Sequence, residues 1–113
     1  MASVLTADLA AGPVTALNAV TTATASNPIT MVPIRRCCGV QVVHTGSPST
    51  VTLTLEGSLD GVNWFTLATW SSGSLSSGAI VWAADKPVSQ VRANLGTLSG
   101  GTSPTVTALL VAG

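Results

Sequence analysis

The stretch that decides the fold runs from Ser49 to Trp70 and reads S-T-V-T-L-T-L-E-G-S-L-D-G-V-N-W-F-T-L-A-T-W. In its first half, threonines alternate with large aliphatic residues, which is the period of a strand with one buried face. The buried face would be formed by Val51, Leu53 and Leu55. Asp60-Gly61 is a turn pair, and the strand that follows carries Trp64 and Trp70. We therefore predict a β-hairpin at the centre of the chain.

Short segments of similar character lie on both sides of this hairpin, separated by turn residues at intervals of roughly 8–12 residues. The expected strands are 29–34, 38–44, 51–56, 64–70, 79–83, 88–95 and 105–111. No long helical period is present. The pattern predicts an all-β fold, a single antiparallel β-sandwich or jelly-roll-like domain of about seven short strands.

The N-terminal quarter of the chain has a different character. Residues 1–27 are rich in Ala, Thr and Val with little periodicity, and Gly12-Pro13 would stop any helical turn that begins near Asp8. We predict an extended arm over residues 1–27 and the β-sandwich over residues 28–113. Such an arm buries little against its own domain and is ordered by a neighbour.

The composition points to assembly. Hydrophobic residues make up 46% of the 113 residues and charged residues 7%, with 4 basic and 4 acidic side chains. A neutral surface promotes association, so we expect much of this surface to be covered by other subunits. The few basic residues argue against nucleic-acid binding, which needs clustered Lys and Arg.

The sequence predicts neither membrane insertion nor secretion. No apolar run approaches the roughly 20 residues of a transmembrane helix, and the first residues lack the basic region of a signal peptide. We expect the protein to be made in a cytoplasm and to stay there, or to be packed into something assembled there.

Groups for catalysis are scarce. His44 is the single histidine and is expected at the surface or in an interface. Glu56 and Asp60 lie four positions apart across a turn, not facing each other across a cleft, and no nucleophile elbow is present. We predict no enzyme activity, no catalytic residue and no cofactor.

The adjacent residues Cys37 and Cys38 are expected to be two reduced thiols, at least one of them buried, because a bridge between neighbours needs a strained geometry. Adjacent cysteines with one distant histidine do not make a zinc site. Asp60 and Asn63 offer oxygen ligands for Ca²⁺, but the preferred interpretation is a structural turn of Asp60, Gly61 and Asn63, with no bound metal.

The three tryptophans allow two interpretations. Exposed indoles stack on sugar rings, so Trp64, Trp70 and Trp82 on a common face would indicate a glycan-binding platform. Large aromatic residues are also favoured in cores and protein interfaces, and this second interpretation is preferred.

Two blocks of sequence resemble a group of small virion proteins of tailed bacteriophages. The first is E-G-S-L-D-G-V-N-W, residues 56–64, and the second is V-R-A-N-L-G-T-L-S-G-G-T-S-P-T-V-T-A, residues 91–108. Both occur in the expected order, and the resemblance covers roughly the last two-thirds of the chain. It implies a β-sandwich structural component of the virion, assembled in the cytoplasm of a bacterial host.

Among such roles, the resemblance favours a capsid decoration (cement) protein that binds the outer surface of the head and stabilises it through non-covalent subunit contacts. The partner would be the major capsid protein, and decoration proteins of this kind typically form trimers. The alternative is a tail, neck or head-fibre component, including a module that binds the host surface or a glycan.

The predicted interface combines the arm with the edge near the arginine pair. Its candidate residues are Val4, Leu5, Leu9, Val14, Leu17, Ile34, Arg35 and Arg36.

Overall fold

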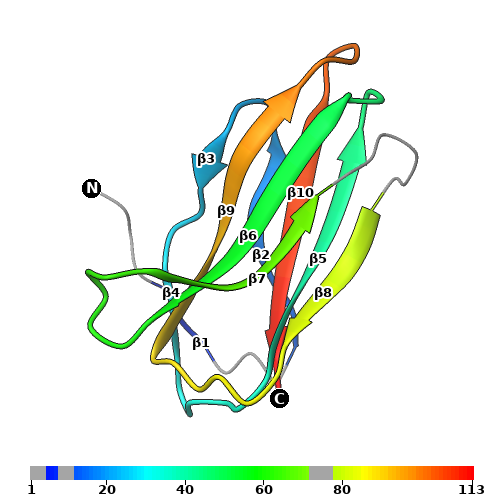
Figure 1. The fold of residues 1–113 in the computed structure, drawn as a ribbon. Coiled ribbons are helices and arrows are strands. Elements are labelled where there is room, and N and C mark those ends of the chain that lie inside the picture. Colours follow the sequence, from blue (N-terminus) through cyan, green and yellow to red (C-terminus); the bar gives the residue numbers. More distant parts are fainter. Residues whose placement is uncertain (1–4, 8–11, 72–77) are drawn as a thin grey trace.

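A computed structural model describes residues 5–7, 12–71 and 78–113. These residues form ten strands and no helix (Figure 1). The strands are β1 (Leu5–Ala7), β2 (Val14–Val20), β3 (Thr24–Ala25), β4 (Ile29–Met31), β5 (Cys38–Thr45), β6 (Thr50–Ser58), β7 (Phe65–Ser71), β8 (Gly78–Ala83), β9 (Gln90–Ser99) and β10 (Thr105–Ala112). In this part of the chain no helix is long and apolar enough to cross a membrane.

The strands form two sheets packed face to face. Sheet A has the order β1-β4-β9-β6-β7, with β3 also paired to β9, and sheet B has the order β2-β10-β5-β8. All pairings are antiparallel except that of β1 with β4. The predicted all-β sandwich is confirmed.

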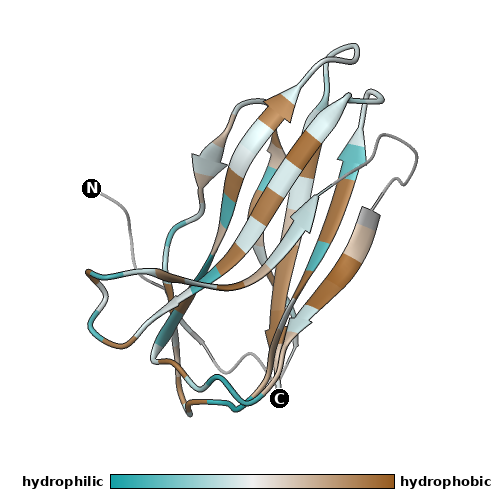
Figure 2. Ribbon diagram, viewed as in Figure 1, coloured by the Kyte–Doolittle hydropathy of each residue, from teal (hydrophilic) through white to brown (hydrophobic). Residues whose placement is uncertain are grey.

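The core lies between the sheets and follows the alternation seen in the sequence, which appears in Figure 2 as alternating bands along β6 and β9. Sheet A contributes the buried side chains of Val51, Leu53, Leu55, Val91, Ala93 and Leu95, and sheet B those of Val40, Val42, Val106, Ala108 and Leu110.

The structure differs from the predicted arm over residues 1–27. Val14–Val20 forms β2, which pairs with β10 at one edge of sheet B, and Leu17 is buried in the core at 4% exposure. The sequence of β2 shows no clear alternation of buried and exposed residues because its pairing with β10 shifts register twice. In addition, Ala19 has a positive φ of 49°. A bulged strand does not show a clean period of two.

The predicted hairpin is present as β6 and β7, but its connection is longer than a two-residue turn. Residues 59–64 join the two strands, and β7 begins at Phe65. Residues 72–77, whose sequence is rich in Ser and predicts a flexible linker, lie outside the described residues.

Candidate interaction site

The loop between β6 and β7 is held together by the carboxylate of Asp60. Its Oδ1 accepts hydrogen bonds from the backbone N–H groups of Val62 and Asn63, both at 2.8 Å, and from the hydroxyl of Ser58 at 2.9 Å. Its Oδ2 accepts a bond of 2.7 Å from Asn63 Nδ2. The bonds from Asn63 and Val62 stabilise the charged form and hold the pKa of Asp60 well below its ordinary value.

Gly61 and Ser89 complete this loop. Gly61 has φ of 77°, a conformation that favours glycine, and its N–H donates to Ser58 Oγ at 2.8 Å. The hydroxyl of Ser89 lies 3.0 Å from the carbonyl oxygen of Ser58 and 2.9 Å from that of Leu59. The structure thus brings the predicted turn residues together in a loop that is bonded on several sides.

This loop and the first residue of β7 expose three large apolar side chains. Leu59, Val62 and Phe65 are 74%, 77% and 68% exposed. Beside them lies a pocket of about 400 Å³ whose lining includes Leu67 and Val88. A well-bonded loop that exposes apolar groups beside a pocket has the character of a protein interface.

Two further loops lie at the same end of the sandwich, at the lower end in Figure 1. Arg36 in the β4–β5 loop forms an ion pair with Asp85 in the β8–β9 loop, and the N–H of Lys86 donates to the carbonyl of Arg36 at 3.0 Å. The β4–β5 loop exposes Val32 and Ile34, each by more than half. We call these three loops, with Val32, Ile34, Leu59, Val62 and Phe65, the loop end.

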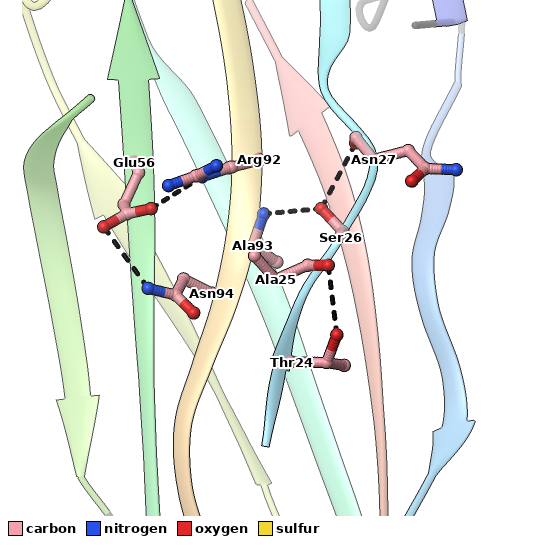
Figure 3. Close-up of polar contacts among 8 residues, drawn as sticks. All are labelled: Thr24, Ala25, Ser26, Asn27, Glu56, Arg92, Ala93 and Asn94. Carbon is pink, nitrogen blue, oxygen red and sulfur yellow. Dashed lines mark hydrogen bonds and ion pairs between the residues drawn. The ribbon is translucent and has the colours of Figure 1, made fainter. Parts of the chain in front are cut away.

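A polar cluster lies on the outer face of sheet A, between β6 and β9. Arg92 Nε donates to Glu56 Oε1 at 2.7 Å, and Asn94 Nδ2 lies 3.4 Å from Glu56 Oε2 (Figure 3). The guanidinium of Arg92 covers the ring of Trp64, with Cζ 4.4 Å from the ring centroid. The two sequence blocks that carry the phage resemblance meet in these contacts, which join the hairpin to β9.

The strand β3 is fastened to β9 beside this cluster. Ser26 Oγ accepts a hydrogen bond of 2.9 Å from the N–H of Ala93, and the N–H of Ser26 donates to the carbonyl of Ala93 at 2.7 Å. Ser26 is buried, and these two hydrogen bonds give partners to its hydroxyl and its backbone N–H. Both groups of contacts in Figure 3 are internal cross-links of the fold.

The three tryptophans do not share a face. Trp64 is on the outer side of sheet A under Arg92, and Trp70 points between the sheets, 5.8 Å from the ring of His44. Trp82 is 59% exposed on the outer face of sheet B. The common face required by the glycan-platform interpretation is therefore not formed.

Part of the outer face of sheet B is apolar. Ile80 and Trp82 from β8 lie beside Gln41, Leu109 and Val111, and with Pro13 these residues line a pocket of about 210 Å³. None of these side chains carries a charge at neutral pH.

The predicted interface residues are dispersed. Val4 and Leu9 lie outside the described residues, and Leu5 pairs with Ile29 through the backbone of β1. Val14 is half-buried in β2. Leu17 is a core residue, so its assignment to an interface was wrong.

The candidates near the arginine pair lie at or next to the surface. Ile34 and Arg36 are exposed at the loop end, and Arg35 is half-buried. Sequence reasoning missed Leu59, Val62 and Phe65, although three large apolar residues around a turn pair were a visible signal.

The expectation for His44 was also wrong. Its side chain is 8% exposed because it points inward from β5 next to Trp70, and its Nε2 has no hydrogen-bond partner among the described residues. Both cysteine thiols are free. Cys38 is buried, which raises its pKa to about 11, and the neighbouring Cys37 adds to the shift.

No protein-family model matches this sequence, and no curated protein matches it. Solved structures share the fold. The SPBc2 prophage-derived protein YomS is 13% identical with a TM-score of 0.58, over 89% of this chain and 92% of that one. The PBSX exported protein XepA is 14% identical with a TM-score of 0.57, over 95% of this chain and 39% of that one.

A family 89 glycoside hydrolase from Clostridium perfringens is 11% identical with a TM-score of 0.60. The match covers 93% of this chain but 14% of the hydrolase. At these identities the likeness shows a shared β-sandwich fold and nothing further.

Proposed function

We propose that this chain is a structural protein of a bacteriophage virion, a decoration (cement) protein that binds the outer surface of the head. The observation that carries the proposal is the loop end, where five large apolar side chains are exposed on well-bonded loops of a chain with formal net charge zero. Large apolar side chains exposed at one end of a domain favour a surface that is covered in an assembly.

Fold analogy gives limited further support. YomS is described as prophage-derived, and its match extends over nearly the whole of both chains. This agrees with the resemblance of residues 56–64 and 91–108 to phage virion proteins. The proposed partner is the major capsid protein, contacted through apolar packing at the loop end, because the low charge of the chain offers few ion pairs.

The alternative function is a tail, neck or head-fibre component. Copy number separates it from decoration. Protein stained on a gel against the major capsid protein should show hundreds of copies per virion for a decoration protein. A few to a few dozen copies would overturn the decoration proposal in favour of the alternative.

A variant tests the loop end itself. The double substitution Leu59→Ser and Val62→Ser removes apolar surface from exposed positions, so the sandwich should stay folded while copies per virion fall about tenfold or more. Thr69→Ser on the exposed outer side of β7 is the matched control and should be incorporated normally. Normal incorporation of the double variant would exclude the loop end as the binding surface.

A further inference from the structure

The five strands at the sheet edges differ in how open they are to pairing. The edges are β1, β3 and β7 in sheet A, and β2 and β8 in sheet B. An edge strand presents unpaired N–H and C=O groups that can pair with another chain, and native proteins block such edges with short strands, bulges, lysines or prolines.

Four of these edges have a feature that hinders pairing. β1 pairs over only three residues, and β3 over two. The bulge and the positive φ of Ala19 distort β2. On β7, Lys86 Nζ donates to the carbonyl oxygen of Leu67 at 3.1 Å, so a lysine occupies a backbone acceptor of that edge.

The edge strand β8 carries none of these devices. Its six residues, G-A-I-V-W-A, include no charge and no proline, and all six pair with β5 in an unbroken register from Cys38↔Ala83 to Val43↔Gly78. In Figure 2 it is mainly brown, the colour of hydrophobic residues. In the described part of the chain no strand pairs with its outer edge.

We infer that β8 pairs antiparallel with β8 of a second copy, around a two-fold axis perpendicular to sheet B. Such an axis keeps the outer face of each sheet on the same side of the joined sheet. In an antiparallel pair, side chains that lie directly opposite each other are on the same face of the sheet. The two-fold axis must therefore pass between one residue of β8 and the same residue of the second copy.

Registers centred on Ile80 and on Val81 each pair five of the six residues of β8, and the cross-strand side chains favour the register centred on Val81. It places Ile80 opposite the partner's Trp82 on the outer face, and Ala79 opposite the partner's Ala83 on the inner face. A β-branched residue opposite an aromatic one is a favourable cross-strand pair. The ring of Trp82 lies over Gly39 of β5, where no side chain could fit, and the side chain remains 59% exposed.

The chemistry of β8 fits a second copy of the chain. A two-fold interface brings identical surfaces together, so a charged residue near the axis would lie close to the same charge on the second copy. Neither β8 nor the outer-face residues near it, the exposed Gln41 and the half-buried Leu109 and Val111, carry a charge, so these positions bring no like charges together. Because β8 pairs with itself and the other edges are blocked, the assembly closes at two.

This pairing goes beyond the proposed function and does not depend on it, since it uses no residue of the loop end. It also differs from the trimer that the resemblance implies, because a three-fold ring joined by strand pairing would require β8 to pair with one of the blocked edges. The solution mass of the purified full-length chain decides between them.

Light scattering coupled to size exclusion should give about twice the chain mass of 11.2 kDa. Ile80→Lys, at a position that is 53% exposed, should give the monomer mass with an unchanged circular dichroism spectrum. Val43→Lys is the matched control on the same face of β5, one strand away from the edge, and should remain a dimer. A monomeric or trimeric wild type, or a dimeric Ile80→Lys variant, would overturn the inference.

Cross-linking tests the register. In a Cys37→Ser background, Val81→Cys places two thiols opposite each other at the axis, within the Cα separation that a disulfide spans. The variant should form a covalent dimer on a non-reducing gel. Ala79→Cys places the two thiols about four residues apart along the strands and should not, because that offset is roughly 13 Å. The reverse result would exclude this register.

Discussion

Arg92 covers the indole of Trp64 and at the same time donates from Nε to the carboxylate of Glu56, at 2.7 Å. The side chains of Arg92 and Glu56 are only 25% and 14% exposed. Arg92→Ala would leave a mostly buried carboxylate without its cation, so we expect a loss of about 1–3 kcal/mol in unfolding free energy. Urea denaturation followed by circular dichroism measures it.

Arg92→Lys is the matched control for charge. Lysine keeps the positive charge but lacks the planar group that stacks on the ring, so this variant should lie between wild type and Arg92→Ala. In a double-mutant cycle with Trp64→Ala, the coupling between the two side chains should be about 0.5–1 kcal/mol. A coupling of zero would mean that the stacking adds nothing to stability.

Gly61 should tolerate no β-branched side chain. Its φ is 77°, and a Cβ would lie 3.1 Å from Gln90 Oε1. Gly61→Val should therefore cost roughly 1 kcal/mol or more. Gly96→Ala in β9 is the comparison, because a Cβ there meets one atom at the ordinary distance of 3.8 Å. Equal melting temperatures for wild type and Gly61→Val would refute this account of the loop.

The Asp60 carboxylate should make stability depend on acid pH. Its folded pKa is lowered from 3.8, mainly by the N–H groups of Asn63 and Val62, so the folded state binds fewer protons than the unfolded chain. The contribution of the Asp60 carboxylate to the free energy of unfolding is therefore complete above about pH 4 and is lost as pH falls further. The stability gap between wild type and Asp60→Asn, measured in urea at several pH values, should narrow below pH 4. A gap that stays constant down to pH 2 would contradict this.

The two cysteines should react at different rates. Burial and the raised pKa of Cys38, about 11, keep its thiol protonated at neutral pH, and the thiolate is the reactive form. Cys37 is half-buried. We expect one thiol per native chain to react rapidly with a thiol reagent at pH 8, and two in denaturant. Cys37→Ser should abolish the rapid phase. If a rapid phase survives in that variant, the fast-reacting thiol is Cys38.

The sequence was sufficient for the fold class wherever alternation was regular. Val51, Leu53 and Leu55 show a period of two because β6 has one buried face, and the same holds for β9 and β10. It was insufficient for β2, where a bulge breaks the period, and for His44, whose burial depends on Trp70 from the opposite sheet. The Arg92–Glu56 contact likewise depends on strand order, which local patterns do not encode.

The sandwich should depend on residues that the sequence assigned to an arm. Leu17 is 4% exposed and packs in the core opposite Ala108 of β10. Leu17→Ala should cost about 2–5 kcal/mol, because it removes buried methyl groups and leaves a cavity. Deleting residues 1–27 removes all of β2 and should prevent folding, whereas deleting residues 1–12 spares β2 and Leu17. Thermal unfolding of both truncations, with Asn18→Ala as an exposed control in the same strand, measures the difference. If the chain without residues 1–27 unfolded as cooperatively as wild type, β2 would be dispensable and the arm interpretation would be restored.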